Sequence, residues 1–220
     1  MRNLTATRSL LLVHGAGGGP WVFDSWLDRF PGFDVRAVDL PAGPYASMAD
    51  YAAAIAGEAT RLRPGLLAVC AWSMGGLAAM MYTQDSARPP QQLVLLESSP
   101  SGEVQGFDST VQLAKGTFDP EEAYGAFPPG ISSRPESSLA RAERKRGISV
   151  PSLPCPTLVV YGRHFPDDRG RRLAATYGAE QLEFPGLGHW DLILDERVPA
   201  AVASWLQAQQ DFVAQSHKVS

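Results

Sequence analysis

The stretch Ala68-Val69-Cys70-Ala71-Trp72-Ser73-Met74-Gly75-Gly76-Leu77 determines how the rest of this chain is interpreted. The apolar run over residues 66–71 predicts a short buried strand, and the Ala- and Met-rich residues from Gly75 onward predict a helix directly after it. Ser73 then lies in the turn between the two elements. Such a sharp turn crowds its own backbone, so it needs small residues two positions before and after its apex, where Ala71 and Gly75 stand. We therefore expect the serine hydroxyl to project clear of the sheet.

This turn has the G-x-S-x-G form of a nucleophile elbow, with Ala71 in place of the first glycine. The helix that follows would direct its free N–H groups at the space beside the Ser73 hydroxyl, where a tetrahedral oxyanion would form. A match of this length also arises by chance, because Gly and Ser are common, so an ordinary turn serine is the alternative. The flanking segments have to decide between the two.

Length, composition and charge limit the class of protein. A chain of 220 residues with 45% hydrophobic and 19% charged residues predicts one soluble globular domain. No apolar run approaches the roughly 20 residues needed to span a bilayer, so we expect no membrane partner. The 19 basic and 23 acidic residues are mostly interspersed, which argues against a nucleic-acid surface. A strand pattern close behind Met1 leaves no room for a signal peptide and predicts a cytoplasmic location.

One basic cluster departs from this even charge pattern, at residues 141–146. A solvated helix face explains it more simply than a phosphate site. The two cysteines, Cys70 and Cys155, lie in or beside predicted strands and lack metal-ligand spacing, so we expect reduced core thiols and no metal site.

Continuous apolar runs separated by helical patterns extend along most of the chain. Strands that are apolar throughout are typical of a parallel sheet covered on both faces, so we predict an α/β fold with a mostly parallel, doubly wound sheet of about six strands. The runs lie at residues 9–13, 34–39, 66–71, 92–96, 156–162 and 180–184.

Helix signals fall between these runs. A helix is expected near residues 23–30 and another near residues 169–177. Ser47 and Asp50 have capping-box spacing and open a further helix. Its core stripe consists of Met48, Tyr51, Ile55, Ala59 and Leu62.

The regular alternation lapses over residues 100–151, which hold several Pro, Gly and Ser residues with scattered aromatics. We interpret these residues as a lid inserted into a core made of residues 1–99 and 152–220. Disorder over residues 127–138 is the competing interpretation for part of the insertion.

Two further segments support the elbow interpretation. The first strand ends in the glycine-rich loop His14-Gly15-Ala16-Gly17-Gly18-Gly19, whose spacing fits neither a P-loop nor a dinucleotide fingerprint convincingly. The last predicted strand is followed by Gly186-Leu187-Gly188-His189-Trp190. Together with the elbow, and in this order, these segments resemble the α/β-hydrolase family from about Ser9 to Leu206.

The resemblance implies roles for particular residues. Ser73 would be the nucleophile and His189 the general base that takes its proton. The backbone N–H groups of Met74 and Ala16 would form the oxyanion hole, with Gly17 as an alternative to Ala16. His14 would brace its loop.

The third member of the triad departs from the family pattern. The usual acid position, three residues after Gly162, holds Phe165, which cannot orient an imidazole. Two carboxylates could replace it while keeping the order serine, acid, histidine. Glu97 follows the strand after the elbow helix, and Asp167 lies just beyond Phe165. We favour Glu97, because a strand tip is a rigid place, and keep Asp167 as the alternative.

The resemblance predicts a serine hydrolase that cleaves an ester, thioester or lactone of a small to medium, largely apolar molecule through an acyl-enzyme. Trp21, Trp72 and Trp190 are the expected substrate-binding residues. The partner is a small molecule, and no cofactor is implied, because the nucleophile and the proton shuttle are both side chains. The chain would be a monomer or a homodimer.

Two alternatives stay open from the sequence. A cyclase, lyase or C–C bond hydrolase could use the same site, and the missing standard acid adds weight to this reading. A ligand-binding protein without activity could have kept the pocket, although an intact Ser73 and His189 argue against it.

Overall fold

The central element is a parallel sheet. The computed structural model describes residues 7–162 and 168–216. Within them, six strands pair in the order β2-β1-β3-β4-β7-β8, and every pairing is parallel. This confirms the predicted sheet. The strands are β1 (Thr7–Val13), β2 (Asp34–Val38), β3 (Gly65–Trp72), β4 (Gln92–Leu96), β7 (Thr157–Gly162) and β8 (Glu180–Phe184).

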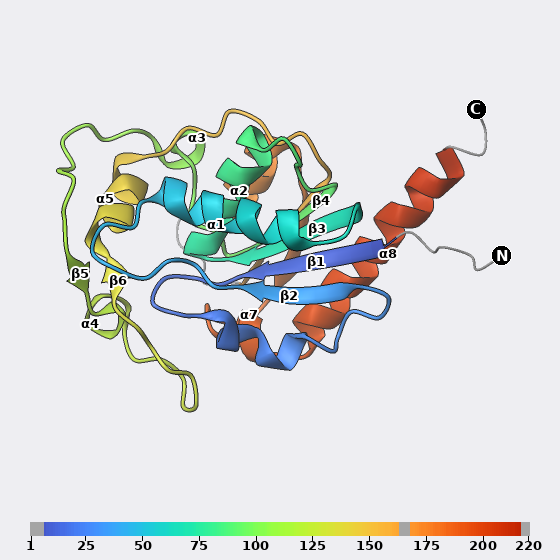
Figure 1. The fold of residues 1–220 in the computed structure, drawn as a ribbon, viewed down its shortest axis with the longest axis horizontal. Helices are drawn as coiled ribbons and strands as arrows, with labels where there is room; N and C mark the ends of the chain where they lie inside the picture. The colour runs from blue at the N-terminus through green and yellow to red at the C-terminus, as the bar shows by residue number, and fades with distance from the viewer. Residues whose placement is uncertain (1–6, 163–167, 217–220) are drawn as a thin grey trace.

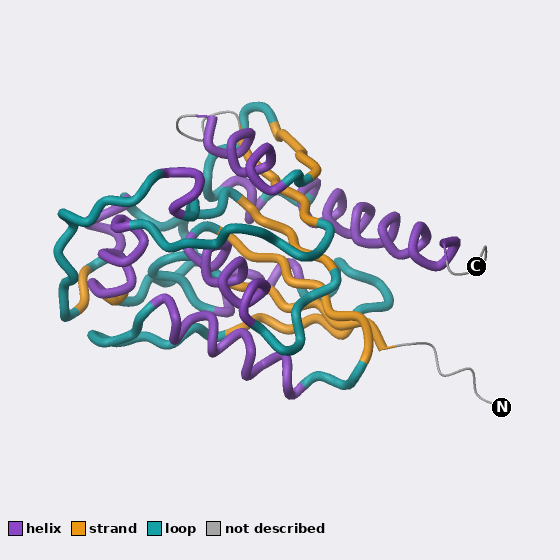
Figure 2. The backbone as a smooth tube through the Cα atoms, turned by 90° about the horizontal axis from the view of Figure 1, so that it is seen from above, coloured by secondary structure: helices purple, strands orange, loops and turns teal. Residues whose placement is uncertain are grey.

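Helices cover both faces of this sheet (Figures 1 and 2). Successive side chains of a strand point to opposite faces, so each strand supplies two cores. Leu11 and Val13 of β1 belong to one core and Leu10 and Leu12 to the other. The first core contains α1 (Met48–Arg61), α2 (Met74–Asp85) and α6 (Arg169–Tyr177), and the second contains η1 (Pro20–Trp26), α7 (Asp191–Leu194) and α8 (Arg197–Ser216).

Helix α1 begins where its capping signal predicts. The Ser47 hydroxyl accepts the N–H of Asp50 at 3.1 Å, and the Asp50 carboxylate accepts the N–H of Ser47 at 2.8 Å. All five residues of the expected stripe are buried. The helix therefore docks by the face that the sequence indicated.

The helix expected near residues 23–30 is wrong in type and position. A 3₁₀ helix, η1, forms earlier, over Pro20–Trp26. Proline fixes φ at the start of this element, and Pro31 with Gly32 closes the segment, so too few residues remain for a stable α-helix. Packing holds η1 in place, since its Val22, Phe23 and Trp26 are buried.

Residues 100–151, here called the cap segment, lie between β4 and β7 in the chain. They gather at one end of the molecule, beyond the carboxyl ends of the sheet strands (Figure 1). Ligand sites of open parallel sheets lie at this edge. The segment contains α3 (Gly102–Gln105), β5 (Thr117–Phe118), α4 (Pro120–Tyr124), β6 (Glu136–Ser137) and α5 (Ser138–Arg146), with β5 and β6 antiparallel.

The two cysteines are reduced, as expected from the sequence. Cys70 is buried in β3 and Cys155 is partly buried before β7, and both are free thiols. Burial raises the pKa of each thiol. Over residues 7–162 and 168–216, no helix has the length and apolar content that crossing a membrane requires.

Candidate active site

Ser73 occupies a strained turn between β3 and α2. Its backbone has φ 55° and ψ −123°, a conformation that side-chain-bearing residues rarely adopt. Neighbouring backbone groups hold it there. The N–H of Ser73 donates to the carbonyl of Leu96 at 2.9 Å, and its own carbonyl accepts N–H groups from Gly76 at 3.0 Å and Ser99 at 2.8 Å. The turn is thus fixed from β4 as well as from its own helix.

Small residues around Ser73 make this packing possible. A Cβ at Gly75 would lie 2.3 Å from the carbonyl oxygen of His14, so only glycine lets α2 start this close to the end of β1. A Cβ at Gly15 would lie 2.9 Å from the Cβ of Ser73. The glycine-rich loop therefore packs directly beside the serine.

Glu97 and His189 form the central polar pair of the site. Glu97 follows β4 and its side chain is buried, whereas His189 lies in the loop after β8. One carboxylate oxygen of Glu97, Oε2, is 2.7 Å from Nδ1 of His189, and the other, Oε1, accepts the N–H of Gly162 at 2.9 Å. With the carboxylate ionised, Nδ1–H donates to it and Nε2 is the basic nitrogen.

Aromatic packing also positions the imidazole. The ring centroids of His189 and Trp72 are 4.7 Å apart, and the indole N–H of Trp72 donates to the backbone carbonyl of His189 at 3.3 Å. Trp190 packs on the same indole at 4.6 Å, and Phe127 of the cap segment packs on Trp190 at 4.7 Å. Trp72, which directly precedes Ser73, therefore connects the elbow to the loop that carries His189.

Gly162 contributes to the site although the sequence analysis assigned it no role. A Cβ there would lie 2.0 Å from the carbonyl oxygen of Leu187 and 3.0 Å from Oε1 of Glu97. Any side chain would displace the histidine loop or the carboxylate. In the sequence, the position of Gly162 at the end of an apolar strand was the feature that could have indicated such a close approach.

Of the two candidate acids, the structure describes Glu97, and it places this carboxylate at the imidazole. The alternative acid, Asp167, lies outside the described residues, as do His164 and His217.

Ser73 and His189 line one cavity of about 600 Å³, together with Ala16, Trp72 and Trp190. No hydrogen bond joins the Ser73 hydroxyl to His189 within the described part of the chain. Catalytic hydrogen bonds in ligand-free enzymes are often long and tighten when substrate binds. For the N–H groups of Ala16 and Met74, no acceptor is found among the same residues.

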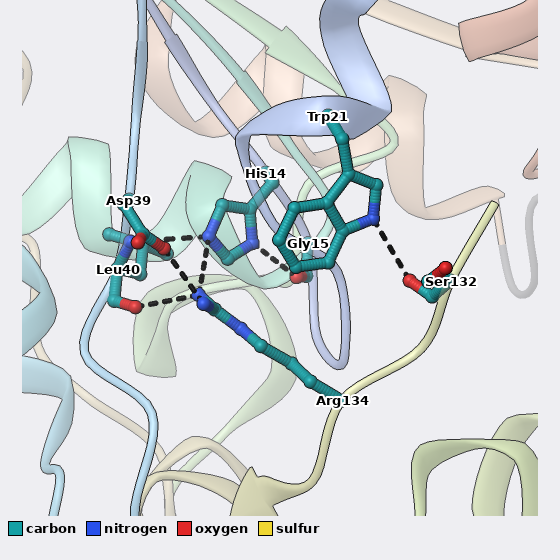
Figure 3. A network of polar contacts seen from close by, with 7 residues as sticks. All are labelled: His14, Gly15, Trp21, Asp39, Leu40, Ser132 and Arg134. Atoms are coloured by element: carbon teal, nitrogen blue, oxygen red, sulfur yellow. Dashed lines mark hydrogen bonds and ion pairs between the residues drawn. The ribbon is translucent and has the colours of Figure 1, made fainter.

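His14 is buried below the glycine-rich loop and has partners at both ring nitrogens (Figure 3). Nδ1 is 2.8 Å from the carbonyl oxygen of Gly15, while Nε2 accepts the N–H of Leu40 at 3.2 Å. Burial lowers the pKa of His14 to about 4, and the positive charge of Arg134 acts in the same direction. The ring is therefore neutral near pH 7 and braces its loop.

Arg134 of the cap segment joins this network (Figure 3). Its guanidinium lies 3.1 Å from Nε2 of His14, donates to the carbonyl of Leu40 at 2.7 Å and pairs with Asp39 at 2.8 Å. Its backbone N–H donates to the carbonyl of Gly17 at 2.8 Å. The segment expected as possibly disordered, residues 127–138, is thus attached to the glycine-rich loop.

Trp21, expected to contact substrate, lies outside the cavity lining. Its ring packs against the Arg134 guanidinium at 5.5 Å, and its indole N–H donates to the carbonyl of Ser132 at 2.9 Å (Figure 3). Trp21 therefore supports the cap segment. Arg134 itself was missed, because no local pattern marks one arginine in a Pro- and Ser-rich segment.

In the described ranges, no group of three or more His, Cys, Asp or Glu side chains is placed to hold a metal ion.

A strained serine at a strand-to-helix turn, beside a carboxylate–imidazole pair at the carboxyl edge of a parallel sheet, defines the α/β-hydrolase class. The model of the alpha/beta hydrolase family matches residues 10–205. The chain belongs to this family.

Relatives and solved structures are consistent with this assignment. A pimeloyl-[acyl-carrier protein] methyl ester esterase of Neisseria meningitidis serogroup B is 34% identical over 130 residues, which is 57% of this chain. The match spans 45% of that relative's length.

Two solved structures share the fold at lower identity. The structure of ClbQ from the colibactin NRPS/PKS pathway has a TM-score of 0.71 at 14% identity, covering 94% of this chain and 100% of that one. A thermophilic esterase from Thermogutta terrifontis also has a TM-score of 0.71, at 21% identity, covering 92% and 90%.

Proposed function

We propose that this protein is a serine hydrolase that cleaves an ester, thioester or lactone through an acyl-enzyme. The observation that carries the proposal is the 2.7 Å contact between Glu97 and Nδ1 of His189, on the rim of the cavity that Ser73 also lines. A buried carboxylate on one imidazole nitrogen selects the tautomer whose other nitrogen can accept a proton.

The chemistry follows from these positions. As Oγ of Ser73 attacks the substrate carbonyl carbon, Nε2 of His189 takes its proton, and Glu97 stabilises the imidazolium. The N–H groups of Met74 and Ala16 would stabilise the negative oxygen. His189 then gives the proton to the leaving alcohol or thiol. Water attacks the acyl-enzyme with the same proton transfers through His189, and the acid is released. The nucleophile, the general base, the acid and the oxyanion donors of this reaction all belong to the chain, and the solvent supplies the water.

The nature of the substrate is proposed from the cavity wall and from the relatives. Trp72, Trp190 and Phe127 give the cavity an apolar aromatic surface beside Ser73. The Neisseria relative is named as a methyl ester esterase, and carrying ester cleavage over to this chain is part of the proposal, because the match spans under half of that protein. We therefore propose a small-molecule acyl ester or thioester.

The test is labelling and turnover at Ser73. A fluorophosphonate probe should add one adduct to the intact protein, and peptide mapping should place it on Ser73. In the Ser73→Ala variant the adduct should vanish, and turnover of a 4-nitrophenyl ester should fall by about 10⁴ to 10⁶. Ser25→Ala, an exposed serine on η1, is the control and should behave as wild type.

Unchanged ester turnover in Ser73→Ala would overturn the serine mechanism. Trapping an acyl group on Ser73 with a slow ester separates the hydrolase from a cyclase or lyase, which would convert substrate without this intermediate.

A further inference from the structure

The cavity beside Ser73 has the opposite charge to the whole chain. The chain has a net charge of −4. The charged residues that line the cavity are the cations Arg141, Arg144, Lys145 and Arg169 and a single carboxylate, that of Glu97. Since Glu97 is already bonded to His189 and to the N–H of Gly162, it does not balance them.

Aromatic rings, and no ion pair among the described residues, hold the Arg141 guanidinium in place. It belongs to the first half of α5, and its guanidinium packs over the rings of Phe118 at 4.5 Å and Tyr124 at 5.4 Å. Its Nε is buried without a hydrogen-bond acceptor. Among the described residues, the Arg141 side chain forms neither an ion pair nor a hydrogen bond. Stacked rings fix the plane of a guanidinium and leave its N–H edge for a ligand.

The buried carboxylate of Glu136 interacts electrostatically with Arg141 but forms its ion pair with Arg144. Glu136 bonds Arg144 at 2.7 Å, and Arg144 also donates to the hydroxyl of Tyr124 at 3.3 Å. Lys145, next along α5, is exposed and forms no ion pair within the described chain. The single carboxylate of Glu136 is thus shared between Arg141 and Arg144, and together with Lys145 these residues leave an excess of positive charge on α5.

We propose that this wall binds an oxyanion carried by the substrate, a carboxylate or a phosphate, with Arg141 as its main contact and Lys145 as a second positive charge. The inference rests on the proposed function and narrows it to acyl esters or thioesters with a negative group away from the scissile carbonyl. Arginine suits this task because its planar N–H fork matches carboxylate and phosphate oxygens.

An anionic substrate group and a cavity-lining basic cluster differ from what the sequence predicted. The substrate was expected to be largely apolar, and residues 141–146 were expected to be a solvated helix face. Only part of that cluster is a free surface. Arg146 is exposed and outside the cavity lining, whereas Arg141 and Arg144 are partly buried and line the cavity.

Paired substrates test the proposal. The first pair is the 4-nitrophenyl monoester of glutaric acid, which carries a free carboxylate, and its methyl-capped neutral counterpart. We expect wild type to favour the charged member by about tenfold or more in kcat/KM, mainly through KM, which corresponds to about 1.4 kcal/mol. Salt at about 0.5 M should reduce the preference, because the attraction is screened.

Variants locate the effect. Arg141→Met keeps the stem length but removes the charge, and should bring the ratio of kcat/KM for the charged and neutral esters close to one. Because this ratio is taken within one variant, a general change in activity cancels. Arg141→Lys should retain part of the preference, and shows that a loss in Arg141→Met is not a folding defect. Arg146→Met, on the same helix outside the cavity lining, should keep the wild-type ratio.

A second pair distinguishes the source of the oxyanion. Thioesters of 2-mercaptoethyl phosphate and of 2-mercaptoethanol, with the same acyl group, place the charge on the leaving side. If the charged member is favoured more strongly in the glutarate pair, the anion belongs to the acyl group. If it is favoured more strongly in the phosphate pair, the anion belongs to the leaving group.

Equal rates within both pairs, or a preference that Arg141→Met leaves intact, would overturn the inference while serine hydrolysis stands. Failure of the proposed function looks different, since wild type would then turn over neither neutral substrate and would not be labelled at Ser73.

Discussion

The two oxygens of the Glu97 carboxylate have different partners, and this division fixes the geometry around His189. Oε1 is tied to the N–H of Gly162 at the end of β7, and only Oε2 faces the imidazole. Glu97 also has a positive φ of 38°, so its backbone bends where β4 ends. The carboxylate is therefore oriented by two neighbouring strands before any substrate arrives.

Replacing Glu97 with glutamine tests this orienting role. The amide keeps the size of the side chain but removes the charge that stabilises the imidazolium, so kcat for a neutral activated ester should fall by about 10⁴ with little change in KM. Steady-state kinetics measure this, with Glu122→Gln, an exposed glutamate of the cap segment, as the control. Retained activity would mean that Ser73 and His189 work without this acid.

The sequence predicted Ser73 and His189 as candidates but left the acid open, and the reason is physical. The serine and the histidine stand in local motifs, so their surroundings in the chain mark them. The acid is defined by which strand lies next to which loop, and the order β3-β4-β7 that puts Glu97 beside Gly162 is a long-range property. The local pattern also allowed Asp167, and Glu97 was favoured over it only because a strand tip is a rigid place.

At the scale of elements, Arg134 links the cap segment to the glycine-rich loop. Within the loop, the N–H of Gly18 donates to the carbonyl of Gly15 at 3.3 Å, and Arg134 adds contacts to His14, Leu40 and Gly17. Its Ala16 is one of the proposed oxyanion donors. The cap segment therefore supports the site from a distance as well as covering it.

Arg134→Gln should loosen this link. Losing the bonds to Leu40 and His14 should lower the free energy of unfolding by about 1–3 kcal/mol. We also expect kcat to fall by about tenfold, because the oxyanion donors are less well fixed. Urea denaturation and ester kinetics measure the two effects.

Asp39→Asn is the matched control for Arg134→Gln. It removes only the partly exposed ion pair with Arg134 and leaves the other bonds, so its effects should be clearly smaller. If both variants lower the free energy of unfolding and kcat equally, the ion pair alone accounts for the stabilising role of Arg134.

Most elements could be predicted because their signals are local. Strand runs and the Ser47–Asp50 cap fixed positions to within a few residues. The 3₁₀ geometry of η1 and the attachment of the cap segment could not be read this way. Both depend on tertiary contacts, such as the bond from the indole of Trp26 to the carbonyl of Ile193 at 2.8 Å.

At the scale of the whole molecule, one buried group couples stability to pH. His14 has a pKa of about 4 in the folded protein and about 6.5 when unfolded. Between these values the unfolded chain binds the extra proton, so the free energy of unfolding falls as pH drops from about 6.5 to about 4. The contribution of His14 across this window is about 3 kcal/mol.

Denaturation by urea at about pH 7 and about pH 4.5 measures this coupling. In His14→Gln the loss of stability between the two conditions should be smaller by about 2 kcal/mol, although the variant starts less stable. A pH dependence identical to that of wild type would show that His14 does not carry it.

The cap segment enters and leaves the core at a single place. The N–H of Gly102 donates to the carbonyl of Ile148 at 2.7 Å, and the Glu103 carboxylate accepts the N–H of Val150 at 2.9 Å. Because the two ends are held together, we expect that residues between them that do not contact the core, unlike Arg134 and Phe127, can change in length or composition without shifting the strands that carry Ser73 and Glu97. Evolution or protein engineering can therefore change the substrate specificity through the cap segment while the reaction at Ser73 stays the same.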